Sequence, residues 1–84
     1  RCIDSYFDLT DNELNRLQKL IKEQKDLILK EDSNVTGFNI GINVGIDAGQ
    51  TVMHTHIHLI PRRKGDMENP RGGVRGVIPE KQSY

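Results

Sequence analysis

The chain has 84 residues, and its twelve Lys and Arg side chains balance twelve Asp and Glu side chains, so the formal net charge is zero. This balance gives no general electrostatic reason to expect nucleic acid or an anionic membrane as a partner, and no apolar run is long enough for a membrane span. A chain of this length makes one domain, residues 1–84, and its single cysteine, Cys2, excludes an internal disulfide and favours a reducing, cytoplasmic setting.

A long amphipathic helix is predicted over about residues 10–31. Thr10 suits the N-cap, Glu13 completes a capping box, and Leu9 before the cap can pack against Leu14. Beyond this start, apolar residues recur at helical spacing and form a stripe that needs a sheet to cover it. The stripe consists of Leu14, Leu17, Leu20, Ile21, Leu27 and Ile28, with Gln24 within it.

Two strands are predicted next, over about residues 36–44 and 51–60, with the turn-like sequence IDAGQ between them. Successive side chains of a strand point to opposite faces, so each strand divides into two sets. One face carries Phe38, Ile40, Ile42 and Val44 of the first strand, and Met53, Thr55, Ile57 and Leu59 of the second. The other face carries Asn39, Gly41 and Asn43, together with Val52, His54, His56, His58 and Ile60.

Antiparallel pairing of these strands places the largely aliphatic face against the helix and leaves histidines, asparagines and a glycine on the open face. Residues 61–84 are rich in Gly, Pro and charge and are predicted as a loop and tail, in which VIPEKQSY could add a short strand. The predicted fold class is therefore α+β, with an antiparallel sheet packed by one long helix.

All three histidines of the chain occupy alternate positions in one window of five residues. Neighbouring imidazoles on a strand are about 6.5 to 7 Å apart, so a metal ion could take two of them and would need a third ligand from elsewhere. A single histidine often does no more than satisfy a half-buried polar strand, but three in a row make that interpretation weak. The row favours acid-base or nucleophilic chemistry on an electrophile such as phosphorus.

His56 is the natural nucleophile, because His54 and His58 stand on either side of it. A bond from the far nitrogen of its imidazole to a carbonyl would fix the tautomer that attacks well. A flanking histidine can then donate to a phosphoryl oxygen or to the leaving group. The pattern thus predicts one attacking imidazole with an assisting imidazole beside it.

The residues before the histidines suit an anionic ligand. The sequence DAGQT offers the backbone N–H groups of small residues, the Gln50 amide and the Thr51 hydroxyl as neutral donors. Gly41 removes side-chain bulk from the ligand face, and the Asn43 amide could bind a ribose hydroxyl. Structural interpretations exist as well, since turns suit Gly45 and Gly49 and a cross-strand pair suits Asn39.

The sequence NVGIDAGQTVMHTHIHLIPRRKGD resembles the signature of the histidine triad (HIT) family, which is His-x-His-x-His followed by two apolar residues. Upstream SYFDLTDNEL and downstream GGVRGVIPEKQSY resemble bacterial members, and IPRRKGD is similar to the branch that acts on diadenosine polyphosphates. The resemblance therefore covers nearly the whole chain. The signature itself is matched by His54, His56, His58, Leu59 and Ile60.

What the resemblance implies is a nucleotide hydrolase or nucleotidyl transferase, acting on phosphoanhydride or phosphoramidate bonds of dinucleoside polyphosphates or nucleoside phosphoramidates. His56 would attack the alpha-phosphate to form a covalent nucleotidyl-histidine, His58 would contact the phosphate or leaving oxygen, and His54 would orient the nucleophile. Asn43 would reach the ribose or phosphate. No cofactor is required, although a divalent metal ion can accompany the nucleotide. The phosphate pocket would be lined by Gly49, Gln50 and Thr51.

The resemblance further implies a homodimer that pairs the helices and central strands of two subunits, with a nucleotide or dinucleotide as the ligand. The full HIT fold has strands before the helix that complete the sheet and wall the base pocket, and these N-terminal strands are apparently lacking here. Relatives with a structural zinc have a histidine before the helix where this chain has Cys2, so no zinc is expected.

Three alternatives stay open. A nucleotide-binding module with little or no turnover would result if half of the site is missing. A metal protein would rest on the alternate histidines alone. Nucleic-acid binding would rest on a basic cluster, but a solvated loop is the better interpretation because acidic residues lie within it. The cluster consists of Arg62, Arg63, Lys64, Arg71 and Arg75, with Asp66 and Glu68 among them.

Overall fold

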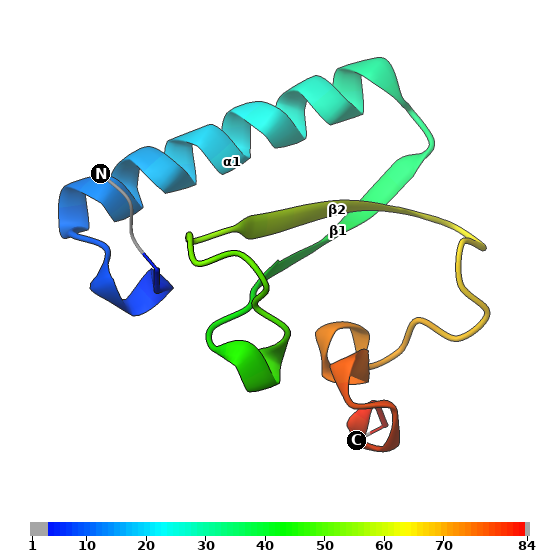
Figure 1. Cartoon of the computed structure of the whole chain (residues 1–84). Coiled ribbons are helices and arrows are strands. Elements are labelled where there is room, and N and C mark those ends of the chain that lie inside the picture. Colours follow the sequence, from blue (N-terminus) through cyan, green and yellow to red (C-terminus); the bar gives the residue numbers. More distant parts are fainter. Residues whose placement is uncertain (1–3, 84) are drawn as a thin grey trace.

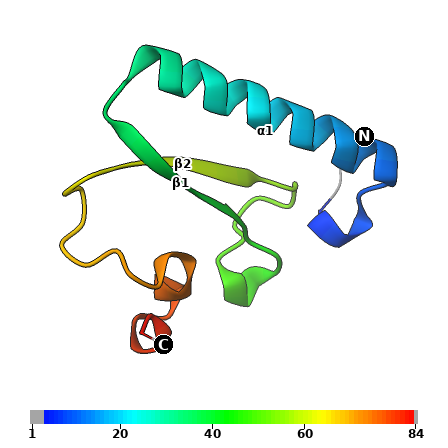
Figure 2. The same ribbon diagram turned by 180° about the vertical axis from the view of Figure 1, so that it is seen from behind.

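The computed structural model describes residues 4–83, in which one long helix lies along a two-stranded antiparallel hairpin (Figure 1). The view from behind shows the C-terminal segment on the side of the hairpin away from the helix (Figure 2). This is the predicted α+β class, and Cys2 lies outside the described residues. The main elements are α1 (Asp11–Glu31), β1 (Val35–Ile42) and β2 (Ile57–Arg63), and short 3-10 helices occupy Tyr6–Asp8, Ile46–Ala48, Gly73–Val77 and Pro79–Lys81.

Helix α1 begins with a complete capping box. The Thr10 hydroxyl accepts from the Glu13 backbone N–H at 3.2 Å, and the Thr10 backbone N–H donates to the Glu13 carboxylate at 2.9 Å. Such a cap contributes about 1 kcal/mol to helix stability. At the other end the Asp32 backbone N–H donates to the Ile28 carbonyl, and the Asp32 carboxylate accepts from Asn34 as the chain turns into β1. No helix within residues 4–83 is long and apolar enough to cross a lipid bilayer.

The apolar stripe of α1 is covered only in part. The helix contacts β2, and on that side its apolar residues are half-buried. Leu20 and Leu27 are each 50% exposed, and Gln24 is exposed as well. Among the described residues Val35 alone is buried, at 5% exposure. The core is therefore thin, and its half-buried helical members are Leu14, Leu17, Ile21 and Ile28.

The hairpin register confirms the predicted division into two faces for the paired residues. One face carries the pairs Phe38 with Pro61, Ile40 with Leu59, and Ile42 with Ile57. The opposite face, which we call the histidine face, carries Gly37 with Arg62, Asn39 with Ile60, and Gly41 with His58. A register shift between Val35 and Gly37 leaves Thr36 as the extra residue of a bulge.

The predicted strand boundaries are wrong at the histidines. Strand β2 begins at Ile57 and not at residue 51, and β1 ends at Ile42 and not at residue 44. The reason lies in the connection: residues 43–50 fold into a turn of their own, so no described backbone lies opposite residues 51–56 to complete a ladder. At the far end β2 extends three residues beyond Ile60, past Pro61 to Arg63, because Val35 pairs with Arg63.

The C-terminal segment is a folded loop and not the short strand suggested for VIPEKQSY. Pro79 starts a 3-10 helix there, as its fixed φ suits a first helical position. The Gln82 side-chain amide donates to the carbonyls of Asn69 and Arg71 at 3.2 and 3.1 Å, and Arg75 Nε donates to the Lys81 carbonyl at 2.9 Å. These bonds close the segment on itself beside β1.

Candidate functional site

His58 is the one predicted catalytic residue that the hairpin itself positions. It lies in β2 directly opposite Gly41, and its side chain is exposed on the histidine face. Gly41 leaves open space beside it, because a Cβ on Gly41 would meet no heavy atom within 4 Å. The imidazole of His58 therefore has room for a ligand on the cross-strand side.

His54 and His56 lie just before β2 and are also exposed. The His54 backbone N–H donates to the Val52 carbonyl at 2.8 Å, which bends the chain at this point. The three imidazoles therefore do not form the straight row predicted from strand spacing. Their catalytic roles stay predictions.

A compact turn precedes the histidines. The Gly45 carbonyl accepts from the backbone N–H groups of both Ala48 and Gln50 at 3.1 Å, and the Ile46 carbonyl accepts from Gly49 at 2.9 Å. Gly45 and Gly49 both have a backbone φ of +92°, which residues other than glycine rarely adopt. Both glycines are therefore required by the turn, whatever they contribute to a ligand.

Asn43 and Gly49, two of the predicted ligand contacts, lie next to each other. The Asn43 amide nitrogen is 3.7 Å from the position that a Cβ on Gly49 would occupy. Thr51 is exposed at the exit of the same turn. The structure thus gathers these three residues at the histidine end of the hairpin, although it leaves their role toward phosphate untested.

Gln50 makes contacts that the sequence did not indicate. Its side-chain oxygen accepts from the Gly45 backbone N–H at 2.8 Å, and its amide nitrogen donates to the Asp4 carbonyl at 2.7 Å. The same nitrogen reaches the carbonyls of Val52 at 3.3 Å and His54 at 3.5 Å. Gln50 therefore joins the N-terminal segment, the turn and the start of the histidine segment.

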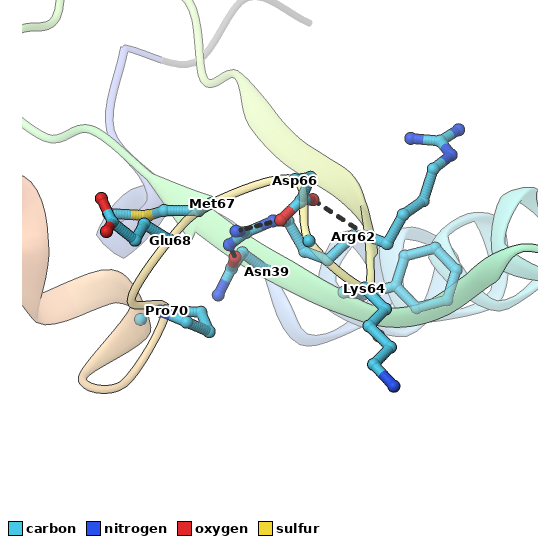
Figure 3. Close-up of a pocket in the computed structure, with 12 residues that line it drawn as sticks. Asn39, Arg62, Lys64, Asp66, Met67, Glu68 and Pro70 are labelled. Carbon is cyan, nitrogen blue, oxygen red and sulfur yellow. Dashed lines mark hydrogen bonds and ion pairs between the residues drawn. The ribbon is translucent and has the colours of Figure 1, made fainter.

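A polar cluster at the other end of the histidine face was missed by sequence reasoning. Arg62 holds Asp66 through Nε and Nη2, each at 2.9 Å, and its Nη1 donates to the side-chain oxygen of Asn39 (Figure 3). The Arg63 backbone N–H also donates to Asp66 at 2.9 Å. The Arg62 guanidinium, with the Arg63 N–H, holds the pKa of the Asp66 carboxyl well below its ordinary value, and Asp66 raises that of Arg62.

Arg63 faces the helix side of the hairpin and ties β2 to the end of α1. Its Nε and Nη2 each lie 2.9 Å from the Asp32 carboxylate. The pKa of Asp32 is lowered first by the Asn34 backbone N–H and then by Arg63. Among residues 4–83 no three His, Cys, Asp or Glu side chains lie close enough together to hold a metal ion.

Comparison with known proteins gives consistent matches. The family model of the HIT domain matches residues 1–65. The chain is 44% identical over 66 residues to a bis(5'-nucleosyl)-tetraphosphatase (asymmetrical) of Schizosaccharomyces pombe, covering 79% of this chain and 36% of the relative. It is 41% identical over 69 residues to a bis(5'-adenosyl)-triphosphatase of Dictyostelium discoideum, covering 82% and 46%.

A bacterial relative and a solved structure match as well. An AP-4-A phosphorylase of Mycobacterium tuberculosis is 38% identical over 71 residues, covering 79% of this chain and 34% of the relative. The crystal structure of the C. elegans NitFhit protein superposes with a TM-score of 0.72 at 40% identity, covering 92% of this chain and 18% of that chain. The matches include both eukaryotes and bacteria, so they do not support the predicted bacterial type. The chain spans about a third to a half of the length of these three curated relatives.

Proposed function

We propose that this chain, which belongs to the HIT domain family, carries the catalytic half of a nucleotide hydrolase or nucleotidyl transferase. Its substrates would be dinucleoside polyphosphates or nucleoside phosphoramidates. Relatives named as a tetraphosphatase, a triphosphatase and a phosphorylase support the dinucleotide class. The observation that carries the proposal is the exposed His58 opposite Gly41, which has no side chain, with His54 and His56 directly before it in the chain.

The reaction would proceed through a covalent intermediate on His56. An imidazole nitrogen attacks the alpha-phosphorus, and a P–N bond to His56 forms as the bond to the leaving group breaks; this is the P–O bond to the leaving nucleotide in a dinucleoside polyphosphate and the P–N bond to the leaving amine in a phosphoramidate. His58 donates a proton or hydrogen bond to the leaving oxygen. Water, or another acceptor such as inorganic phosphate, then attacks the phosphorus, the P–N bond breaks, and the nucleotide is released.

This role requires residues 52–56 to continue β2, and the observed register says where they would lie. Since Gly41 pairs with His58, the same register extended would set Asn43 opposite His56 and Gly45 opposite His54. His54 would then support the orientation of His56, and the Asn43 amide would face the ribose or phosphate. Gly49, Gln50 and Thr51 would lie beside the phosphates, with Gln50 exchanging a backbone partner for the ligand.

Turnover of diadenosine tetraphosphate and adenosine phosphoramidate tests this proposal. His56→Asn keeps a polar side chain of similar size and removes the nucleophile, so we expect the rate to fall about a thousandfold or more. Gln18→Ala, an exposed position on α1, serves as the control and should keep the wild-type rate. Equal rates for wild type and His56→Asn would exclude His56 as the nucleophile.

The exposed apolar surface supports the proposal of a homodimer. Leu20 and Leu27 on α1, and Ile40 on β1, are half-exposed at 50%, 50% and 51%. Complete burial of an exposed side chain of this size contributes about 1.5 to 3 kcal/mol, so covering the exposed half of each would contribute about half of that and would add to a thin core. Sedimentation of the protein at micromolar concentration should give twice the chain mass, and a monomer would contradict the proposal.

A second function is favoured by one observation, the position of residues 51–56 outside the β-ladder. With His54 and His56 unaligned, the chain would bind nucleotide with little or no turnover. Calorimetry that shows saturable binding of diadenosine tetraphosphate, together with no product in the same sample, would select this binding module. Turnover that depends on His56 would exclude it.

A further inference from the structure

The histidine face continues beyond the histidines to a pocket at the far end of the hairpin. His58, Ile60 and Arg62 alternate along β2 and share this face, so His58 and Arg62 are roughly 13 Å apart at their backbones. Ile60 between them is 48% exposed. A ligand held at His58 can therefore extend along one uninterrupted surface toward Arg62.

The pocket at Arg62, which we call the Arg62 pocket, has a volume of about 530 Å³, within the range of small-molecule sites. Its floor is β1 and β2, where Asn39 and Arg62 converge, and its outer wall is the loop that follows β2 (Figure 3). The C-terminal segment closes one side, since Gly73 also lines the pocket and lies beside the Asn39 amide. The loop contributes Asp66, Met67, Glu68 and Pro70.

The charges of this pocket do not suit a phosphate. Asp66 already binds the Arg62 guanidinium through both of its oxygens, so that cation is compensated. The Glu68 carboxylate adds a second negative charge to the lining, and Arg63 is paired with Asp32 on the other side of the sheet. Lys64 also lines the pocket, but its side chain points away from Asn39 and Asp66 (Figure 3). An anion placed beside Arg62 would therefore meet two carboxylates and one compensated guanidinium.

The same groups suit a flat, uncharged ring with hydrogen-bonding edges. The ion pair fixes the planar guanidinium of Arg62, and guanidinium planes stack on aromatic rings. Met67 and Pro70 add apolar contacts. Asn39 uses its side-chain oxygen for Arg62, so its amide nitrogen is the donor that remains, while Glu68 can accept from an exocyclic amine.

We propose that the Arg62 pocket binds the purine base of the leaving nucleotide of a dinucleoside polyphosphate. This inference rests on the proposed function, because the attacked phosphate must lie at His56 and His58. The polyphosphate chain would run over Ile60, and the second base would enter between Arg62, Met67 and Pro70. The pocket then distinguishes dinucleotides from mononucleotides, and it acts in specificity without touching the reacting atoms.

Amide chemical shifts of the His56→Asn variant, which cannot consume its ligand, test this placement. Three probes are compared: diadenosine tetraphosphate, AMP, which lacks a second base, and inorganic tripolyphosphate, which lacks any base. We expect the amides of Asp66, Met67, Glu68 and Asn69 to shift with the dinucleotide alone. Equal shifts at these four residues with AMP or with tripolyphosphate would overturn the proposal.

The same titration separates this inference from the proposed function. Shifts at residues 56–58 without any shift at 66–69 would support the proposed nucleotide site and contradict base binding in the Arg62 pocket. No shift at either set of residues would contradict both the proposed function and base binding in the Arg62 pocket.

A double variant gives the quantitative test. Met67→Ala/Glu68→Ala removes one apolar contact and one acceptor from exposed loop positions, and we expect about tenfold weaker binding of diadenosine tetraphosphate with AMP binding unchanged. Val77→Ala/Glu80→Ala changes the same kinds of side chain at exposed positions outside the pocket and should leave both affinities at the wild-type value. Equal affinity of the loop variant and wild type for the dinucleotide would overturn the proposal.

Discussion

The two ends of β2 are held in different ways. At the Arg62 end the strand is paired with β1, and two arginine–carboxylate contacts fix it, one to Asp66 in the following loop and one to Asp32 at the end of α1. At the histidine end the ladder stops at Ile57, and the Gln50 amide donates to the carbonyls of Val52 and His54 in the segment before it. The proposed chemistry thus lies at the less constrained end of a strand whose other end is anchored by both arginines.

This difference is consistent with a division of work between the two ends. The anchored end can bind a ligand with little loss of side-chain conformational entropy, because its side chains are already fixed. A segment outside the ladder can move as ligand binds, and local opening of this kind requires little free energy where few contacts are lost. The hairpin would then combine a rigid recognition end with a histidine end that is completed on binding.

Among substitutions outside the three histidines, Gly41→Val is expected to have the largest effect on the histidine end. A Cβ at this position would meet no heavy atom within 4 Å, and the β-branched side chain would occupy the open space opposite His58, so kcat/KM should fall about a hundredfold with an unchanged melting temperature. Turnover assays and thermal melting measure the two quantities. Thr36→Val, an exposed position in the bulge of β1, is the control. Unchanged kcat/KM in Gly41→Val would show that the histidine face does not hold the substrate.

Gln50→Ala should affect the same end by a smaller factor. The substitution removes the bonds to Gly45, Asp4 and Val52, and the loss of one or two such bonds corresponds to about a tenfold to hundredfold drop in activity. Hydrogen exchange of residues 51–56 should become faster, while exchange within β1 stays the same. Faster exchange throughout the hairpin would instead assign Gln50 a general role in stability.

Arg62→Ala should act mainly on the anchored end. It removes the side-chain donor of Asn39 and leaves Asp66 with the Arg63 backbone N–H, so we expect the melting temperature to fall by a few degrees, with turnover of adenosine phosphoramidate close to wild type. Lys25→Ala breaks a more exposed ion pair, with Asp26, and should have almost no effect on the melting temperature. Equal melting temperatures for all three proteins would mean that the Arg62 contacts do not anchor the strand.

The smallest expected effect is the pH dependence of the melting temperature that Asp66 causes. The pKa of Asp66 is lowered in the folded chain, so its contribution is present above the ordinary Asp pKa of about 3.9 and is lost as the pH falls through the folded value. Asp66→Asn should therefore melt below wild type at neutral pH, and the difference should shrink as the pH falls below about 4. A constant difference across this range would contradict the assignment to ionised Asp66.

Much of the fold was predictable because local rules fix it. Thr10 and Glu13 specify the start of α1, and two-residue alternation correctly assigns His58, Asn39 and Gly41 to one face. The start of β2 was not predictable in this way, because a strand needs a backbone opposite it and strand propensity does not show whether that partner is present. Histidines at strand spacing therefore do not by themselves make a straight row.

The site was predictable only where the types of the residues themselves indicate its chemistry. The three histidines and the turn glycines stand out in the sequence, but the partners of Gln50 are backbone groups, one of them 46 positions away. From the sequence, the basic residues around Arg62 are interpreted as a solvated loop because Asp66 and Glu68 lie among them. Only the register shows that Asn39, 23 positions away, completes the cluster at Arg62. The four-residue spacing of Arg62 and Asp66 directly after a proline is the signal that could have indicated this cluster.

The central claim, nucleophilic attack by His56, is tested most directly by the intact mass of the protein after brief exposure to diadenosine tetraphosphate and quenching without acid. We predict an added mass of one adenylyl group on the wild-type chain and on Gln18→Ala, and none on His56→Asn. An adduct of the same size on His56→Asn, or turnover by the wild type with no adduct at any quench time, would contradict the claim.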